Sequence, residues 1–348
     1  MAWASSYIRA DGGGQRVQAL ARALENSGIV IRRIGIGPQE PAEIAARNSG
    51  LHELKRKFLP VPLRRRMERE LSSKLATDNA VSFVSGTHRW CVQNSTNTWI
   101  DYPDLWSEYA RNNARSVGYI PSITSRLQAE VWSRREIVES SAARVVTTAS
   151  WTDSEILGGA AVWLPNPTHE AAQLASKKVA PGSGEPIFGM LANFDYPPNR
   201  DAYRRLIEEW IPHLGLNSNR VIVAGFGSND LPVNECIDMW GPLESTDEFY
   251  RRVDVALAPI ALGGGMKVKV VEAMAHGLPV ITTEQARAGL PPAIRAECID
   301  WREFALANRC VVKDPRDNAD VAIELRTFSR EWFDAKVLEL WSERIAPL

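Results

Sequence analysis

The sequence has few of the residues that mark several large classes of protein. Its 348 residues include only four cysteines and five histidines. The cysteines form no C-x-x-C pair and no histidine lies at metal-ligand spacing, which argues against a disulfide scaffold and a zinc site. No stretch approaches the roughly 20 apolar residues that a membrane-spanning helix needs, and the N-terminus lacks the pattern of a signal peptide. These absences predict a cytoplasmic protein with free thiols.

No sign of charge dominates the chain. Charged residues make up 24% of the sequence and the net charge is -1, which excludes nucleic acid as a partner because binding to its phosphates requires a basic surface. The one basic segment covers residues 51–75, where Leu63, Met67, Leu71 and Leu75 recur every four residues as in an amphipathic helix. This helix either rests peripherally on the inner face of a membrane or is a solvated face of the protein.

The most informative stretch covers residues 253–282. Its pattern predicts a buried strand at 253–258, a glycine turn at Gly263, Gly264 and Gly265, a helix at 266–275 and a second strand at 280–282. Backbone N–H groups at a helix start attract phosphate, and Lys267 and Lys269 add positive charge there. The alternative is a tight turn with solvated lysines and an ion pair to Glu272.

A second glycine-rich segment lies near the N-terminus. The pattern predicts a strand at 2–8, a loop containing Gly13 and Gly14, a helix at 15–27 and a strand at 30–36. The loop is not G-x-G-x-x-G and no acidic residue ends the second strand, which disfavours a dinucleotide site. The loop is either part of a ligand site or a simple helix-entry turn.

Polar residues follow two further strands that we predict at 80–84 and 98–100. His88 comes after the first strand, and Asp101 and Asp104 follow the second. Open α/β sheets bind ligands at the carboxyl ends of their strands, so these side chains are candidates for binding a hydroxyl of a ligand or taking its proton. The alternatives are a surface histidine at 88 and a helix N-cap at Asp104.

Several motifs occur together in an order that is specific to one family. They are NFDYPPN at 193–199, VIVAGFG at 221–227, GPL at 241–243, VDVALAP at 253–259, GGGMKVKVVEAM at 263–274 and PVI at 279–281. This segment resembles the nucleotide-sugar-binding domain of GT-B glycosyltransferases, in particular glycosyltransferase family 4, the glycosyl transferases group 1. The resemblance implies an α/β protein with two Rossmann-like, doubly wound parallel-sheet domains that face a central cleft.

The resemblance also implies the domain boundaries. We expect an acceptor-side domain at residues 1–176, a linker at 177–185 and a donor-binding domain at 186–324. A C-terminal helix at about 325–348 is expected to cross back and complete the first domain, as it does in GT-B enzymes.

The activity that the resemblance implies is transfer of a sugar from a nucleotide-diphosphate sugar to a hydroxyl of a saccharide, a lipid-linked saccharide or a small molecule, in polysaccharide or glycoconjugate biosynthesis. The enzyme would be a hexosyltransferase that uses no cofactor and no metal. The resemblance implies retention at the anomeric carbon, and the alternative is inversion with His88, Asp101 or Asp104 as the base. Lys267 would stabilise the leaving phosphate and Glu272 would hold the ribose. The donor-binding set comprises Gly263, Gly264, Gly265, Lys267, Lys269, Glu272, Asn193, Asn199, Arg200 and Gly241, with Gly13 and Gly14 in the cleft loop of the first domain.

Two departures from the family pattern leave other functions open. Many retaining members carry two glutamates separated by seven residues, and Gly264 occupies the first of these positions. The family's arginine and lysine in the loop near 193 are also replaced, since this region offers Asn193, Asn199 and Arg200. The alternatives are a non-catalytic partner subunit that binds nucleotide sugar and a sugar-nucleotide epimerase of the same fold.

Overall fold

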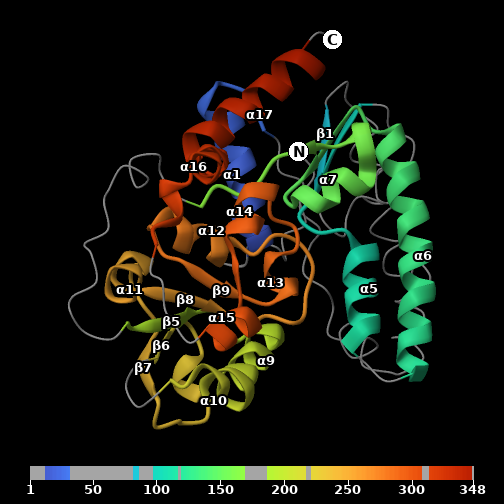
Figure 1. Ribbon diagram of the computed structural model, residues 1–348. Helices are drawn as coiled ribbons and strands as arrows, with labels where there is room; N and C mark the ends of the chain where they lie inside the picture. Colours follow the sequence, from blue (N-terminus) through green and yellow to red (C-terminus); the bar gives the residue numbers. More distant parts are fainter. Residues whose placement is uncertain are drawn as a thin grey trace. The chain divides into compact units, whose positions relative to one another are not determined.

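The protein consists of two compact α/β units. The computed structural model describes residues 12–31, 81–85, 97–116, 119–168, 186–216, 221–307 and 313–346. The first unit combines Met1–Pro165 with Phe333–Leu348, and the second is Asn166–Trp332. Each contains one sheet of parallel strands (Figure 1). The chain therefore changes unit between residues 165 and 166 and again between 332 and 333. The sequence instead predicts a linker at 177–185 and a return to the first unit near 325.

The sheet of the first unit contains four described strands in the order β1-β2-β3-β4. These are β1 (Ser82–Ser85), β2 (Thr98–Tyr102), β3 (Val145–Thr148) and β4 (Val162–Trp163). Every residue of β2 and β3 is buried, as expected for parallel strands that are covered on both faces. The predicted strands at 80–84 and 98–100 are confirmed to within two residues.

The described helices of the first unit include a long hairpin. They are α1 (Gly12–Asn26), α5 (Trp106–Ser116), α6 (Tyr119–Ala142) and α7 (Trp151–Leu157), with the short helix η3 (Gly158–Ala160). Helices α5 and α6 run beside each other (Figure 1). Because α1 begins at Gly12, the predicted loop residues Gly13 and Gly14 lie in the first helical turn. That expectation is corrected: none of these glycines needs the positive φ of a tight loop, so the helix can begin three residues earlier.

The sheet of the second unit has the order β10-β9-β8-β5-β6-β7. Its strands are β5 (Phe188–Leu191), β6 (Val221–Ala224), β7 (Ile237–Gly241), β8 (Val255–Ala258), β9 (Val280–Thr282) and β10 (Ile299–Asp300). Strand β5 comes first in the chain and pairs with both β6 and β8. The direction of chain connection therefore reverses between β5 and β8, and open α/β sheets bind their ligands at such a switch point.

Helices cover this second sheet and lead out of the unit. They are α9 (Pro197–Arg205), η4 (Leu206–Trp210), α10 (Ile211–Leu214), η5 (Ser228–Asp230), α11 (Thr246–Arg252), α12 (Val268–Ala275), α13 (Glu284–Arg287), α14 (Pro292–Glu297), α15 (Trp301–Ala307), η6 (Pro315–Asp317), α16 (Ala319–Arg326) and α17 (Arg330–Arg344). Helix α12 buries Val270, Val271 and Met274, and packs on β8 and β9. Among the described helices, none is long and apolar enough to cross a membrane.

Candidate functional site

The switch point of the second sheet brings two helix N-termini to one edge. The loop after β5 leads into α9, and the loop after β8 leads into α12. Both strands are parallel members of one sheet and pair directly, so their carboxyl ends, and the helices that start there, lie beside each other. Because a helix N-terminus carries a partial positive charge and unpaired N–H groups, this edge suits an anion.

The glycine loop after β8 has a backbone that favours glycine. Gly263 has a φ of 101° and Gly265 a φ of 64°, values that residues with a Cβ rarely adopt. The Gln285 amide donates to the Gly263 carbonyl at 2.7 Å, and the Lys267 ammonium donates to the carbonyls of Gly264 and Gly265. These contacts engage the carbonyl groups of the loop.

The N–H groups of the same loop remain available. Among the described residues, no acceptor receives a hydrogen bond from the N–H groups of Gly263, Gly264 or Gly265. Unsatisfied donors that follow one another at a helix start form a binding site for phosphate oxygens. The structure thus brings Gly263, Gly264, Gly265 and Lys267 together as the sequence predicts.

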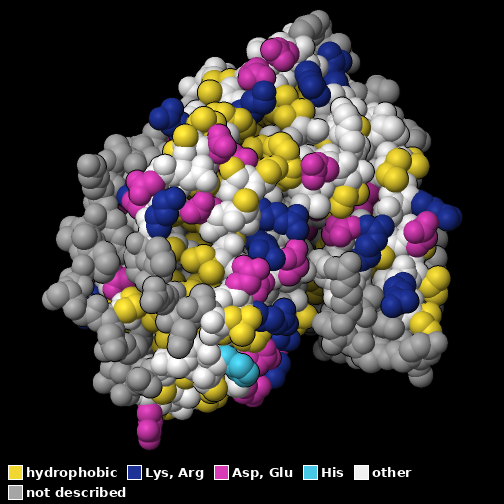
Figure 2. Space-filling view, in the orientation of Figure 1, with side chains coloured by type: hydrophobic (Ala, Val, Ile, Leu, Met, Phe, Trp, Pro, Cys, Tyr) yellow, Lys and Arg dark blue, Asp and Glu magenta, His cyan; other side chains and the backbone are white. Residues whose placement is uncertain are grey.

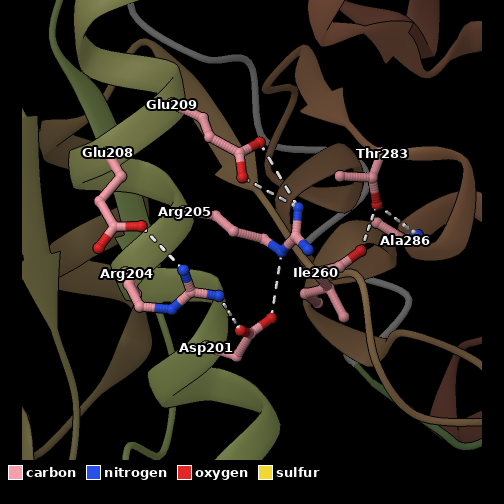
Figure 3. A network of polar contacts seen from close by, with 8 residues as sticks. All are labelled: Asp201, Arg204, Arg205, Glu208, Glu209, Ile260, Thr283 and Ala286. Carbon is pink, nitrogen blue, oxygen red and sulfur yellow. Dashed lines mark hydrogen bonds and ion pairs between the residues drawn. The ribbon is translucent and has the colours of Figure 1, made fainter. Parts of the chain in front are cut away.

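The start of the loop is held by a hydrogen bond from the segment after β9. The Thr283 hydroxyl donates to the Ile260 carbonyl and accepts from the Ala286 N–H at 3.0 Å (Figure 3). Figure 3 also shows α9 next to this contact, where Asp201 receives hydrogen bonds from Arg204 and Arg205. The Thr283 contact fixes the start of the loop to the end of β9, so the N–H groups face a defined position.

Lys269 connects the two helices. Its ammonium donates to the Asn199 side-chain oxygen at 3.0 Å, which joins the first turn of α12 to the first turn of α9. Burial, and then the neighbouring charge of Lys267, lower the pKa of Lys269 from 10.5 to about 8. A lysine that is held in an unfavourable place by its surroundings is typical of a functional site. A bound diphosphate would offset both causes.

Glu272 belongs to a chain of contacts that the sequence does not reveal. The buried Tyr250 donates its hydroxyl to the Glu272 carboxylate at 3.1 Å, and its ring stacks on His276 with centroids 4.5 Å apart. The His276 ring nitrogens contact the Glu272 carbonyl at 2.7 Å and the Asp247 carboxylate at 3.0 Å. Burial raises the pKa of Glu272, although the Tyr250 hydrogen bond opposes this rise. Tyr250 therefore fixes the direction of the carboxylate.

The loop after β5 contributes mainly to the shape of the site. The Asn193 side chain accepts from the Asp195 N–H at 3.0 Å, its carbonyl accepts from Asn199 at 2.7 Å, and Arg200 donates to the Phe194 carbonyl at 2.6 Å. Asn193 and Arg200 thus hold the loop, and Asn199 holds Lys269.

An aromatic residue from the same loop lies beside the glycine turn. The half-exposed Tyr196 has its hydroxyl 4.0 Å from the position that a Cβ on Gly263 would occupy. Sequence reasoning missed Tyr196, although the residue lies within the NFDYPPN motif. Its place identifies it as a further candidate for contact with a ligand of this loop.

Gly241 does not join this group. It ends β7, an edge strand three positions away from β8 in the sheet, or roughly 14 Å at the usual strand spacing. Its carbonyl accepts from the Gly225 N–H at 2.8 Å, and Asn229 would contact any Cβ placed on it. These contacts give Gly241 a structural role in the turn after β6, and its contact with a donor stays a prediction.

In the first unit, Asp101 is a buried anchor. It receives hydrogen bonds from Arg16 at 2.6, 2.9 and 3.1 Å and from the Thr147 hydroxyl at 2.8 Å, and both charged side chains are 0% exposed. Arg16 also donates to the Leu164 carbonyl at 2.7 Å. A base for an acceptor hydroxyl must reach the substrate, so the structure contradicts that role for Asp101.

The other acceptor-side candidates have different outcomes. Asp104 is exposed and lies after the end of β2. Burial, and to a smaller extent the negative charge of Asp104, raises the pKa of the buried Asp153 to about 7. Asp153 accepts from the Leu105 N–H at 3.2 Å. His88 and the basic segment 51–75 lie outside the described residues. Within the described ranges, no three His, Cys, Asp or Glu side chains are grouped to hold a metal ion.

Comparison with known proteins identifies the second unit. Residues 185–327 match the family model of glycosyl transferases group 1, which confirms the resemblance to that group; family 4 in particular stays a prediction. No match was found among curated protein sequences.

Similar solved structures cover almost the whole chain. A glycosyltransferase from Rickettsia africae ESF-5 has a TM-score of 0.55 and 13% identity, covering 99% of this chain and 97% of its own. HepE from Anabaena, in complex with UDP and glucose, has a TM-score of 0.54 and 12% identity, covering 98% of each chain. An alpha,alpha-trehalose-phosphate synthase (UDP-forming) from Burkholderia vietnamiensis has a TM-score of 0.52 and 12% identity, covering 89% of this chain and 88% of its own. The predicted GT-B fold is confirmed.

Proposed function

We propose that this chain, whose residues 185–327 form a glycosyl transferases group 1 domain, moves a sugar from a nucleotide-diphosphate sugar to an acceptor hydroxyl. The observation that carries the proposal is the coincidence of the unbonded N–H groups of residues 263–265 with Lys267 and Lys269 at the start of α12. A donor diphosphate would accept hydrogen bonds from these N–H groups and would be attracted by the two ammonium groups.

The chemistry follows from where charge develops. When the bond from the sugar to the diphosphate breaks, negative charge grows on the leaving phosphate oxygen. Fixed donors that stabilise this charge more in the transition state than in the ground state accelerate the reaction. The loop N–H groups and Lys267 take this role, and they require no metal. Glu272, held by Tyr250, accepts hydrogen bonds from the ribose hydroxyls.

Retention at the anomeric carbon fits this arrangement. In a retaining reaction the leaving phosphate helps to take the acceptor proton, so no separate base is needed. Asp104 is the described candidate for a base in the inverting alternative, since Asp101 is closed off by Arg16. Two of the similar structures are described with UDP or as UDP-forming, so UDP-sugars are the first donors to test. The acceptor is a saccharide, a lipid-linked saccharide or a small molecule.

A second function rests on one residue. Gly264 stands where many retaining members of the group carry the first of two glutamates, and the site therefore has only Glu272. This substitution favours a non-catalytic subunit that binds nucleotide sugar without transferring it. The two functions share a donor site and differ in turnover.

The test separates binding from turnover. Thermal unfolding is measured in the presence of UDP, GDP, ADP, CMP or dTDP and of the nucleotide sugars that contain them. Each measurement is made with and without a metal chelator. A ligand at about one hundred times its dissociation constant stabilises by roughly 2.7 kcal/mol. Release of nucleoside diphosphate from the donor that binds is then followed in the wild type, in Lys267→Ala and in the control Lys336→Ala, whose side chain lies on α17.

We expect stabilisation by one nucleoside diphosphate that survives the chelator, and a loss of turnover of more than tenfold in Lys267→Ala alone. Binding without any turnover would favour the partner subunit. If none of the nucleotides stabilises the protein, both functions are contradicted.

A further inference from the structure

Helix α6 carries an exposed apolar face that the proposed function does not use. Ile123, Leu127, Val131, Ile137 and Val138 are 43%, 58%, 44%, 55% and 66% exposed. They extend along a helix of 24 residues, about 36 Å at 1.5 Å per residue. Figure 2 shows yellow side chains along the edge that α6 forms in Figure 1, with dark blue and magenta among them. A row of exposed apolar residues along one helix is typical of an interaction surface.

The opposite face of α6 already has its partners. Ala129, Trp132, Glu136 and Ser140 are buried. Trp132 packs against Trp106 of α5, and Glu136 accepts hydrogen bonds from the first N–H groups of α5. The outer apolar residues are therefore not needed to attach α6 to its own unit.

The outer face has the spacing of a coiled-coil seam. Exposed residues occur at positions 123, 127, 130, 134, 137 and 141, alternately four and three residues apart. This average of 3.5 residues keeps one stripe facing a second helix along its whole length. The stripe reads Ile, Leu, Glu, Arg, Ile, Ser, with its charged residues in the middle.

The stripe is complementary to itself when a second copy runs antiparallel. A two-fold axis near position 132 places Leu127 opposite Ile137 of the second copy. The same axis places Glu130 opposite Arg134 of the second copy, and this ion pair occurs twice because the axis repeats it. A parallel copy would instead place like charges in the same layer. Charges at seam positions commonly fix the register and direction of paired helices.

We propose that two copies of this chain associate through α6, as an antiparallel helix pair whose seam is formed by residues 123–141. Within one chain, Arg134 and Glu130 form an ion pair at 3.1 Å while they are 79% and 59% exposed. Such an exposed pair contributes little to the stability of a single helix. Between two copies the same charges become partly buried and gain an opposite partner.

The charge pattern favours a second copy over a lipid surface. A membrane-bound α6 would place Glu130, in the middle of the stripe, against anionic headgroups, which repel it. An antiparallel copy adds a second arginine opposite this carboxylate, whereas an anionic lipid surface adds none. This inference does not depend on the proposed function.

The experiment measures the dimer dissociation constant by sedimentation equilibrium of the full chain. We expect a constant in the roughly micromolar range, because a single helix pair is small among stable interfaces. Glu130→Arg alone and Arg134→Glu alone each place like charges opposite each other, and should each weaken the dimer at least tenfold. The double variant restores opposite charges and should restore the dimer.

Mixing the two single variants gives the decisive result. In a mixed dimer the Glu130→Arg chain presents two arginines to the two glutamates of the Arg134→Glu chain, so the heterodimer should form at least as tightly as the wild-type dimer. No effect confined to one helix can produce this rescue. The matched control reverses the exposed pair between Arg204 of α9 and Glu208 of η4, which has the same spacing and is 54% and 55% exposed. It should leave the dimer unchanged.

The opposing outcomes are equally clear. A wild-type chain that stays monomeric at about one hundred times the expected constant would overturn the proposal. Dimers that persist in Glu130→Arg, or single variants that fail to associate on mixing, would overturn it as well. So would flotation of the monomer with phosphatidylglycerol vesicles that Leu127→Glu abolishes, because the face would then bind lipid.

Discussion

Replacing Lys269 by methionine should make the free protein more stable and its donor binding weaker. The ammonium is half-buried beside Lys267 at the start of α12, where a helix dipole also disfavours positive charge. Methionine has a similar length and no charge, so Lys269→Met removes this cost while it keeps most of the packing. The same change removes a charge that a donor diphosphate would need.

The magnitude follows from the pKa of Lys269. A lowering from 10.5 to about 8 corresponds to about 3 kcal/mol, at about 1.4 kcal/mol for each tenfold change in the protonation equilibrium. The variant also loses the hydrogen bond to Asn199, which is worth about 1 kcal/mol. The free energy of unfolding should therefore rise by about 2 kcal/mol at pH 7.

The pH dependence has a definite sign. The folded-state pKa lies below the unfolded one, so the unfolded chain binds more protons between pH 8 and pH 10.5. Above pH 10.5 the lysine is neutral in both states and costs the folded state nothing. As the pH falls through 8 the folded chain must take up the proton in an unfavourable place, and the wild type loses stability. The advantage of Lys269→Met should accordingly be largest below pH 8 and should shrink toward pH 10.

The assay combines denaturant unfolding with nucleotide titration. Lys269→Met and the control Lys336→Met are compared at pH 7 and pH 9.5, without nucleotide and with the nucleoside diphosphate that stabilises the wild type. We expect a more stable free variant whose ligand-induced stabilisation is reduced by more than 1 kcal/mol. A less stable free variant that binds the nucleotide normally would refute the reasoning, because Lys269 would then be a structural hydrogen-bond donor.

Three further changes test other parts of the structure. Glu272→Gln should weaken binding of a ribonucleoside diphosphate at least tenfold, and Tyr250→Phe, which only frees the carboxylate, should weaken it less; calorimetric titration measures both. Asp153→Asn should stabilise the protein at pH 8 and have little effect at pH 4, because burial raises the pKa of Asp153 to about 7 and its charging between these pH values costs stability; urea unfolding at the two pH values checks this. Arg16→Met should destabilise by about 3 to 5 kcal/mol, because it leaves the buried Asp101 carboxylate without its guanidinium counter-ion, whereas Arg16→Met with Asp101→Leu should recover much of the loss.

Much of the fold can be predicted from the sequence because its signals are local. Buried parallel strands are short runs of β-branched and apolar residues, as in β6 and β8, and a glycine loop followed by an apolar-periodic helix marks α12. These signals locate β1, β2, β8 and β9 to within two residues. The order of motifs then identifies the second unit as a glycosyl transferases group 1 domain.

Contacts between distant residues could not be predicted in the same way. Asp101 follows the predicted strand 98–100, but the strand continues to Tyr102, and successive side chains on a strand point to opposite faces. Its partner Arg16 lies 85 residues away on α1. Nothing in the sequence shows whether the Asp101 carboxylate is exposed or is buried against an arginine. The Tyr250–Glu272 contact joins two helices and is hidden for the same reason.

The structure gives a physical reason for the missing basic residue at position 199. A cation at position 199, close to where the family places basic residues, would stand within hydrogen-bonding distance of the Lys269 ammonium and would be repelled by it. Asn199 is instead a neutral acceptor that holds Lys269 at the start of α12. In the proposed donor site the positive charge would thus come from Lys267 and Lys269 at the start of α12 and not from position 199. Two lysines at a helix N-terminus and backbone N–H groups without acceptors are both unfavourable in the free protein. Such unfavourable features are expected to occur together where a bound ligand compensates them.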